Sequence, residues 1–405
     1  MSLTKVSYSM INGASVNVLD FGADATGATD SRAAIQAAID YAYSLRDPVS
    51  LNKQPAVYLP AGKYLIQDSL VAYDYTTIVG EGIRNSFIVG TLANKSIIRP
   101  QYGETPSYTD RTIGWNIQNI TVNNLATGSG IALNFGNVGY SWVLNVNAGG
   151  HTGLKCTHRT YYSFFVNLTL TGFICADLQS DGGGNEFVNP NFGFSGTNSI
   201  GVKIRSGTWG FQGGVIDTGD ATALSCMDVG SDGGTPLATV GISNLYVEAV
   251  NAGTFAIRFY DSTVQSSVFG LQRRNVIGAV TYSATTNSIG IINISPTGQF
   301  NTQGRNIQQA FSRNYSTIDG GIIGKEGGTL LVTAGDLATA GNLSVSSLML
   351  NGGSFSATGI YSGAGSPQGS VTAATGSLFL NTSGGANTTL YVKESGSGNT
   401  GWVAK

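Results

Sequence analysis

The sequence predicts a mostly β, turn-dense protein, and three features of its composition indicate this. Glycine makes up 57 of the 405 residues, roughly twice its ordinary share of ~7%. Charged residues are only 11%, whereas the hydrophobic share of 41% is enough for a core. The remaining surface must consist largely of Asn, Ser, Thr and Gly, which favour turns and strands over helices.

Charge and hydropathy exclude several classes of partner. The net charge of −2 offers no basic footprint, so no nucleic-acid partner is expected. The start, MSLTKVSYSMINGA, lacks the long apolar segment of a signal peptide, and no run of ~18 apolar residues occurs. We therefore expect a protein made in the cytoplasm, not exported by the ordinary signal and not inserted in a membrane.

Cysteine and histidine usage leaves carboxylates as the candidate catalytic groups. Cys156, Cys175 and Cys226 form no C-x-x-C pair, which predicts small buried thiols rather than a disulfide framework or a zinc site. His151 and His158 lack the spacing of a zincin helix, and no G-x-S-x-G motif is present. No metal or cofactor is expected.

The first ordered segment, residues 17–42, is predicted as a strand, a loop and one helix. Residues 16–19 read as a short strand, and residues 24–29 as a turn-rich loop. Thr29 or Asp30 is the expected N-cap of the helix. The helix has one apolar face, formed by Ala34, Ile35, Ala38, Ile39, Tyr41 and Ala42.

Two further segments add predicted strands after the helix. AVYLPAGKYLIQDSL, residues 56–70, and TTIVGEG, residues 76–82, predict three strands separated by turns. Together with VLDFGADATGATDSRAAIQAAID they resemble the entry into a right-handed parallel β-helix of the pectate-lyase-like superfamily, most closely its bacteriophage tailspike branch. The lead-in KVSYSMINGASVNVLDFGA is also similar to tailspike starts. The resemblance covers about the first 80 residues and is specific for fold rather than substrate.

The resemblance implies a role for the helix and a setting for the protein. The helix would cap the first rung, covering a sheet edge that otherwise invites pairing with other chains. GADATG, by contrast, is no dinucleotide fingerprint. The resemblance to tailspikes implies a homotrimer that is attached to a virion through other tail proteins. Such a protein recognises a bacterial surface polysaccharide (O-antigen or capsule) and usually cleaves it.

The middle of the chain reads as a solenoid. Residues 115–316 are short apolar runs broken by Gly and Asn, without any long helical pattern, which fits stacked rungs. Because equivalent residues of successive rungs lie ~4.8 Å apart, Asn at repeated turn positions would form ladders.

Composition changes near residue 318 and again near residue 366. The segment after 318 is rich in Gly and Ser and too poor in apolar residues to fold well alone, so it is expected to wind with two further copies. The last segment predicts two strands around Gly384-Gly385, closing on Trp402. It contains one acid, Glu394, and no histidine, so it cannot supply an acid–base pair by itself. The expected organisation is a lead-in at 1–16, the β-helix at 17–318, a trimerisation segment at 319–365 and a small β module at 366–405.

Glycosidic hydrolysis requires two carboxylates, and an acidic repeat supplies candidates. Glu186, Asp217 and Glu248 are each 31 residues apart and lie at or near predicted strand ends, which suggests equivalent places on successive rungs. Asp220 is a further candidate. Four other acids lie in turn-like sequence and are expected to be solvated loop residues: Asp177, Asp181, Asp228 and Asp232.

Aromatic and basic side chains provide candidate sugar contacts. Trp209, in SGTWGFQGG, is flanked by glycines that suggest a surface turn, and Tyr161 is a second candidate for stacking on a sugar ring. Arg159, Arg205 and Arg258 are candidate partners of an acidic sugar. Packing in the core, or simple solvation, remains the alternative for each.

Two other functions were weighed. A plant-polysaccharide enzyme of the same superfamily lacks support, because the polygalacturonase motifs and the clustered acids of a calcium-dependent lyase are absent. A non-enzymatic fibre or adhesin stays open, since fold does not fix function. The hypothesis from sequence is a tailspike that hydrolyses a polysaccharide, with Asp217, Glu248, Glu186 and Asp220 as candidate acids.

Overall fold

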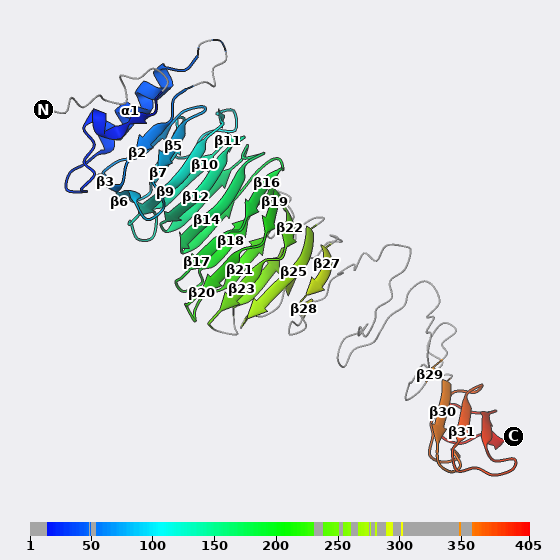
Figure 1. The fold of residues 1–405 in the computed structure, drawn as a ribbon. Helices are drawn as coiled ribbons and strands as arrows, with labels where there is room; N and C mark the ends of the chain where they lie inside the picture. The colour runs from blue at the N-terminus through cyan, green and yellow to red at the C-terminus, as the bar shows by residue number, and fades with distance from the viewer. Residues whose placement is uncertain are drawn as a thin grey trace, which may run out of the picture. The chain divides into compact units, whose positions relative to one another are not determined.

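Parallel strands stacked one above another build the first unit of the chain, Met1–Ser316, in the computed structural model of the protein (Figure 1). A second unit comprises Thr317–Lys405. The structure describes residues 14–47, 49, 54–230, 238–250, 254–260, 266–274, 276, 280–281, 289–294, 301–302, 348–349 and 359–405. Most of the expected lead-in and most of the expected trimerisation segment therefore lie outside the described residues.

Each rung of the first unit supplies strands to two large sheets. The 16-stranded sheet is divided along its length by one turn residue per rung, and we call its two parts the first limb and the second limb. The first limb contains β1 (Val16–Asn17), β2 (Val57–Leu59), β5 (Thr77–Gly80), β16 (Asn185–Val188), β19 (Gly207–Gln212) and β22 (Ala238–Ser243). The second limb contains β3 (Gly62–Ile66), β6 (Ser86–Gly90), β17 (Asn191–Phe194), β20 (Val215–Thr218) and β23 (Tyr246–Ala249).

The remaining strands of the rungs either cross both limbs or form the other sheets. Both limbs are crossed by β9 (Asn116–Asn124), β12 (Trp142–Gly149), β14 (Phe164–Gly172), β25 (Ser266–Arg274) and β27 (Ile289–Ile294). The 10-stranded sheet contains β4 (Leu70–Ala72), β7 (Ser96–Pro100), β10 (Ile131–Gly136), β13 (Thr152–Thr157), β15 (Ile174–Leu178), β18 (Ile200–Ile204), β21 (Ser225–Val229), β24 (Phe255–Phe259), β26 (Val280–Thr281) and β28 (Asn301–Thr302). A small pair consists of β8 (Thr112–Ile113) and β11 (Val138–Gly139).

An asparagine ladder marks the line between the two limbs, as the sequence predicts. The ladder positions of successive rungs have positive φ and hold Asn119, Asn145, Asn167, Asn189, Gly213 and Asn244. The side-chain amide of Asn145 donates to Asn119 at 3.2 Å, that of Asn167 to Asn145 at 3.0 Å, and that of Asn189 to Asn167 at 2.9 Å. Asn tolerates this left-handed conformation better than most residues, and its amide both donates and accepts along the stack.

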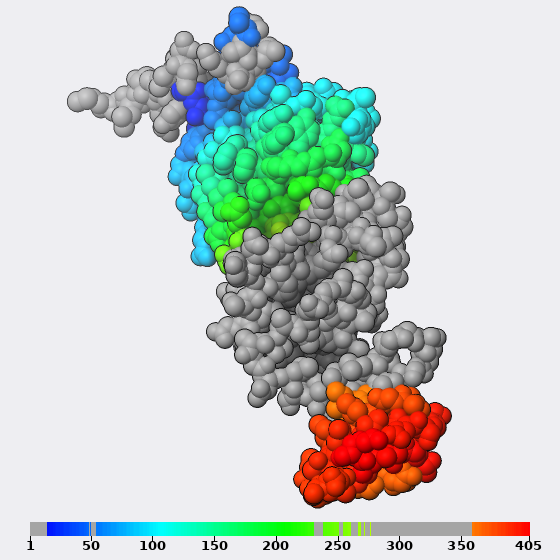
Figure 2. Space-filling view, turned by 90° about the vertical axis from the view of Figure 1, so that its right-hand side faces the viewer, coloured from blue at the N-terminus to red at the C-terminus, as the bar shows by residue number. Residues whose placement is uncertain are grey.

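Inside the solenoid, equivalent residues of neighbouring rungs also stack. Phe165, Phe187 and Phe211 are register partners with ring centroids 4.7 and 4.9 Å apart and nearly parallel planes. All three are fully buried, and each contributes about 1.5–3 kcal/mol of transfer free energy. The chain order of the rungs is visible in the space-filling view, where the colour of the described residues runs from blue through cyan to green (Figure 2).

One helix covers the first rungs, which confirms the predicted cap. The short helix η2 (Val18–Phe21) leads to α1 (Arg32–Ser44), which buries its apolar face at the N-terminal end of the solenoid (Figure 1). The Gln36 amide donates to Val71 O at 3.1 Å and accepts from Val71 N at 2.8 Å, so it satisfies the backbone of edge strand β4. The N-cap is Ser31 rather than Thr29 or Asp30, although the Asp30 carboxylate accepts from the first-turn N–H of Arg32.

The second unit contains a small sheet of its own. Its strands are β29 (Leu348–Met349), β30 (Gly359–Gly363), β31 (Leu378–Asn381), β32 (Leu390–Lys393) and β33 (Trp402–Ala404). The antiparallel pair β31–β32 encloses the predicted Gly384-Gly385 turn, and Trp402 packs in the core with Phe379 and Tyr391. The chain is thus a mostly β protein with a parallel β-helix, one helix near the N-terminus and a small C-terminal sheet.

Breaking the ladder at its middle should destabilise the solenoid. Asn167→Ala removes two side-chain hydrogen bonds and puts a Cβ at φ 50° without a compensating amide, so we expect a loss of ~2–4 kcal/mol. Asn167→Gly keeps the backbone relaxed, as Gly213 does naturally, and should lose only about half as much. Urea midpoints of the two variants measure this. Equal midpoints for wild type and both variants would show that the ladder does not stabilise the fold.

Candidate functional site

A polar face runs along the outside of the second limb. Residues alternate there, so buried side chains such as Val122, Leu170 and Ile216 point inward while their neighbours point outward. Two columns of register partners form the face. The polar face comprises Thr121, Asn147, Thr169 and Asn191 in one column, and Asn123, Gly149, Thr171, Gly193, Asp217 and Glu248 in the other.

Three hollows of about 460, 310 and 430 Å³ lie on this face and at its margin. The first two share Asn123 and Thr171, and the second and third share Thr169, so the three hollows adjoin, and we call them together the groove. Arg84 borders the middle hollow and is exposed. Amides, hydroxyls and a cation around an open groove suit a hydroxyl-rich, extended ligand.

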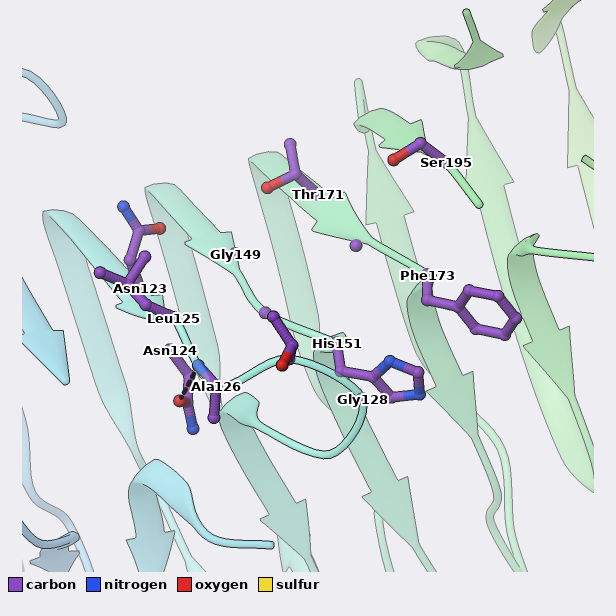
Figure 3. A pocket seen from close by; sticks show the side chains of 13 residues that line it. Asn123, Asn124, Leu125, Ala126, Gly128, Gly149, His151, Thr171, Phe173 and Ser195 are labelled. Carbon is purple, nitrogen blue, oxygen red and sulfur yellow. Dashed lines mark hydrogen bonds between the residues drawn. The ribbon is translucent and has the colours of Figure 1, made fainter. Parts of the chain in front are cut away.

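The largest hollow lies where the second limb turns toward the 10-stranded sheet (Figure 3). His151 and Phe173 follow β12 and β14, and their rings stack with centroids 5.0 Å apart and planes within 9°. Asn124 holds the adjoining loop, because its side-chain oxygen accepts from Leu92 N and Ala126 N. The corner therefore presents ring surface beside a fixed polar loop.

Two carboxylates meet further along the polar face. Asp217 of β20 and Glu248 of β23 are direct register partners, so their Cα atoms are ~4.8 Å apart. Tyr246 donates its hydroxyl to Glu248 Oε2 at 2.9 Å. The neighbour of Asp217 on the preceding rung is Gly193, which leaves that side of the carboxyl open.

Electrostatics distinguish the two acids. Desolvation by the surrounding strands, followed by the nearby charge of Glu248, raises the pKa of Asp217 above its ordinary value. The Asp217 residue itself is exposed on the sheet surface. Two carboxylates at this separation resist ionising together, so one of them can retain a proton where an isolated Asp would not.

Glu186 does not belong to this column, and the structure corrects the predicted repeat in that respect. It lies in β16 of the first limb, where its register partners are Phe164 and Gly210. Asp217 pairs with Gly193 on the preceding rung, not with Glu186. The rung from Gly193 to Asp217 is shorter than the rung from Asp217 to Glu248, so the 31 residues between Glu186 and Asp217 do not correspond to one rung. Glu186 Oε2 accepts from the Gln212 amide at 3.4 Å.

Asp220 serves a turn. Its carboxylate accepts from Gly196 N at 2.6 Å and from the backbone and hydroxyl of Thr222 at 2.8 and 2.7 Å. These hydrogen bonds, led by the Thr222 hydroxyl, lower the pKa of Asp220. It is therefore an ionised turn-forming residue and a poor candidate for a general acid.

The structure also corrects the predicted aromatic contact. Trp209 is 0% exposed, in β19, and its indole N–H donates to Ser206 O at 2.9 Å. The flanking glycines fit the packed rung rather than a surface turn. Trp142 is instead the exposed tryptophan, at 52%, and stacks on Phe164 with ring centroids 4.7 Å apart.

Two acids predicted as solvated loop residues are paired with arginines on strands. Asp177 accepts from Arg205 Nη2 at 3.0 Å, so Arg205 is engaged within the fold. Asp228 and Arg258 form a buried pair, with Arg258 Nε donating to Asp228 Oδ1 at 2.7 Å. These partners occupy neighbouring strands of the 10-stranded sheet or follow them directly. Asp181 is exposed as predicted, and Asp232 lies outside the described residues.

Arg159 and Tyr161 lie away from the polar face, between β13 and β14 at the opposite end of the rung. The groove residues Arg84, Asn147 and His151 were not identified from the sequence. Asn147 lies in β12, so strand alternation places it on the polar face once the strands are aligned. Arg84 and His151 lie in turns between strands, and only the paths of those turns bring them to the groove. Asn147 Oδ1 is buried and has no hydrogen-bond partner among the described residues.

The described parts of the chain contain no group of three His, Cys, Asp or Glu side chains that could hold a metal ion. Cys156, Cys175 and Cys226 are free and buried, as predicted. Within the same described ranges, no helix has the length and apolarity needed to cross a bilayer.

The pKa of Asp217 predicts a pH-dependent stability difference. Below the ordinary Asp value of 3.8, the carboxyl is protonated in the folded and the unfolded chain alike. As the pH rises through the raised pKa, the folded chain holds the proton more tightly and so loses stability relative to the unfolded chain. Asp217→Asn should therefore have a higher Tm than wild type at pH 7 and an equal Tm at about pH 3. Scanning calorimetry at both pH values, with Asp181→Asn as an exposed control, tests this. A lower Tm for Asp217→Asn at pH 7 would contradict it.

Comparison with known proteins identifies the fold family. The family model described as rhamnogalacturonase A/epimerase, pectate lyase-like, matches residues 15–217, which is half of the chain. No curated protein matches the chain.

Several solved structures align with this chain. ORF18 of Geobacillus virus E2 aligns with a TM-score of 0.54 and 18% identity, over 72% of this chain and 58% of that protein. Gene product 12 of bacteriophage phi29 aligns at 0.44 and 14%, over 68% of this chain and 43% of that one. The A-module of the Azotobacter vinelandii mannuronan C-5 epimerase AlgE6 aligns at 0.41 and 17%, over 71% and 97%. This chain spans about half the length of the two viral proteins. On the match to the family model, it belongs to the pectate lyase-like family of β-helix proteins.

Proposed function

We propose that this protein binds a bacterial surface polysaccharide, an O-antigen or a capsule, and hydrolyses its glycosidic bonds with Asp217 and Glu248. The observation that carries the proposal is the side-by-side register of the two carboxylates on the polar face, with the pKa of Asp217 raised. Hydrolysis of a glycosidic bond needs one protonated and one ionised carboxyl group, and we assign the first role to Asp217 and the second to Glu248.

Adjacent rungs favour the retaining mechanism. Carboxyl groups that are ~5–5.5 Å apart fit a retaining pair, whereas an inverting pair needs ~6.5–9.5 Å. Protonated Asp217 donates its proton to the glycosidic oxygen while Glu248 attacks the anomeric carbon, which breaks the bond and forms a glycosyl ester. Asp217 then takes a proton from water, the water oxygen attacks the anomeric carbon, and Glu248 leaves as a carboxylate.

Neighbouring groups support these roles. The Tyr246 hydroxyl donates to Glu248 Oε2 and orients the nucleophile. Glu186 is not a suitable partner of Glu248 for an inverting pair, because it lies on the first limb, away from the column of Glu248.

The groove gives the proposed substrate a path. Thr171 borders two of the hollows and lies two ladder steps from Asp217, a distance of ~10 Å. This is about the length of two sugar units. The residues that line the hollows all precede Asp217 along the polar face. A polysaccharide in the groove would therefore span several sugar units before it reaches the pair, as endo-acting cleavage requires.

The setting that we propose is a phage tail. The tailspike resemblance of the first 80 residues supports a homotrimer joined to the virion by other tail proteins. Outward side chains of the first limb provide a surface that a second copy would cover, because Trp142 is half exposed beside the partly buried Leu144, Phe164 and Val166.

Substitution of either acid should abolish cleavage without abolishing binding. Asp217→Asn and Glu248→Gln should each reduce the rate of cleavage by a factor of ~10² or more, since positioned acid–base groups commonly contribute 10²–10⁴. Glu186→Gln and Asp181→Asn are the matched controls and should cleave at near wild-type rates. The assay incubates the protein with surface polysaccharides of candidate hosts, sizes the products and follows the new anomeric centre by NMR, where retention is expected.

Three results would contradict the proposal. Normal cleavage by both acid variants would remove Asp217 and Glu248 from the mechanism. Products with an unsaturated uronate would indicate a lyase. Binding of a polysaccharide by the wild-type protein without any cleavage would assign a receptor-binding fibre or adhesin instead.

A further inference from the structure

Four tyrosines gather on the corner of the solenoid between the 10-stranded sheet and the first limb. Tyr161 and Tyr162 lie between β13 and β14, Tyr140 precedes β12, and Tyr108 lies in the loop before β8. We call these four residues the tyrosine cluster. Tyr108, Tyr140 and Tyr162 are 50%, 49% and 55% exposed, so the cluster presents ring surface to the solvent.

The rings are held in a fixed arrangement. Tyr140 and Tyr162 stack with centroids 5.4 Å apart and planes at 21°. Tyr161 meets both of them edge-on, at 5.2 and 5.7 Å. Because each ring buttresses another, the exposed faces lose little side-chain freedom when a ligand binds, which lowers the entropic cost of binding.

Backbone strain singles out two of these tyrosines. Tyr140 and Tyr162 have φ of 54° and 50°, although bulky residues rarely adopt this conformation. At the equivalent position, the rungs on either side use Gly114 (φ 75°) and Gly184 (φ 76°). Tyr75 (φ 59°) holds this position one rung before Gly114, and the rings of Tyr75 and Tyr162 lie over Gly114 and Gly184. Glycine thus satisfies the backbone without strain, whereas the strained tyrosines add ring surface.

Two arginines of the cluster lack anionic partners. The Arg111 guanidinium carbon lies 5.4 and 5.2 Å from the Tyr140 and Tyr161 ring centroids, and the Arg159 guanidinium carbon lies 4.3 Å from that of Tyr108. Neither side chain forms an ion pair with a described residue, and Arg111 Nε is buried with no hydrogen-bond partner.

The acids nearby do not neutralise these arginines. Asp110 directs its carboxylate to Ser107, accepting from the backbone at 3.0 Å and from the hydroxyl at 2.8 Å. Asp181 is exposed to solvent. Because neither guanidinium is paired with an acid of the described residues, an arriving carboxylate gains a charge-assisted hydrogen bond from the guanidinium's accessible nitrogens.

We propose that the tyrosine cluster binds a sugar residue that carries a carboxylate, a hexuronic acid, at a site separate from the catalytic pair. The C–H face of the sugar ring packs on Tyr140 and Tyr162, while its carboxylate meets the guanidinium groups of Arg111 and Arg159. This site lies on the first-limb side of the rung, whereas the polar face lies on the second limb. It anchors an acidic polymer independently of cleavage.

A matched pair of monosaccharides tests the site. Methyl β-D-glucuronide and methyl β-D-glucoside differ only in the carboxylate, and their binding to the full chain is measured by saturation-transfer NMR titration. We expect the glucuronide to bind in the range of ~1–10 mM and the glucoside at least about 10-fold more weakly, because the charge-assisted contact is missing. Asp217→Asn should bind the glucuronide as the wild type does, which separates this proposal from the catalytic one.

Two variants locate the binding. Arg111→Gln should reduce glucuronide affinity to that of the glucoside. Tyr162→Gly installs the residue that neighbouring rungs carry, so it should fold with an unchanged or higher Tm while losing affinity for both sugars by about 5-fold or more. Arg46→Gln, which removes another arginine packed on a tyrosine, and Tyr41→Ala, on α1, are controls that should leave binding unchanged.

Three outcomes would overturn the proposal. The first is equal affinity for the two sugars, since the arginines would then play no part. The second is glucuronide binding that survives both Arg111→Gln and Tyr162→Gly. The third is the absence of any glucuronide signal up to tens of millimolar, which would mean that the tyrosines and arginines only pack the turns.

Discussion

The whole solenoid depends on one constraint, the parallel register of each rung on the next. Backbone hydrogen bonds set the spacing between rungs, and the side-chain ladder at Asn119, Asn145, Asn167 and Asn189 fixes which residue follows which. A slip of one residue would turn the buried Phe165–Phe187–Phe211 stack outward. The core and the ladder therefore enforce the same alignment, and α1 closes the edge where that alignment begins.

Function follows from what this alignment places outside. Columns of equivalent residues become linear surfaces, so a column that contains Asn, Thr and Gly on early rungs and two acids on later ones produces a groove leading to a carboxylate pair. The carboxylates destabilise each other, and the fold tolerates the cost because the stacked core around Ile216 and Val247 is fully buried. The fold tolerates the backbone strain at Tyr140 and Tyr162 for the same reason.

Much of the fold could be predicted from the sequence because the signals are local. The helix cap, the short strands and the asparagine ladder each depend on residue types at fixed spacing. The pairing of Asp217 with Glu248 was also predictable, since their separation is one rung. Glu186 was misplaced because rung lengths vary, so a spacing that equals one period need not preserve the register.

Burial was harder to predict than position. Trp209 looks exposed from its glycine neighbours, yet those glycines allow close packing of rungs. Asp228 seems to belong to a turn, but Arg258 on the next rung is its partner, which only the register reveals. The tyrosine cluster shows the same limit, because Arg159 meets Tyr108, and Tyr140 meets Tyr162, through turns whose paths are not local properties of the sequence.

The central claim is that Asp217 and Glu248 occupy one column, and a disulfide tests it most directly. In the double variant Asp217→Cys, Glu248→Cys, adjacent Cα atoms ~4.8 Å apart can form a disulfide without backbone movement. The native cysteines are buried and should not compete. After mild oxidation, peptide mapping should find the 217–248 disulfide in high yield, and no equivalent disulfide in the control Glu186→Cys, Asp217→Cys. A 186–217 disulfide, or no disulfide between 217 and 248, would contradict the account.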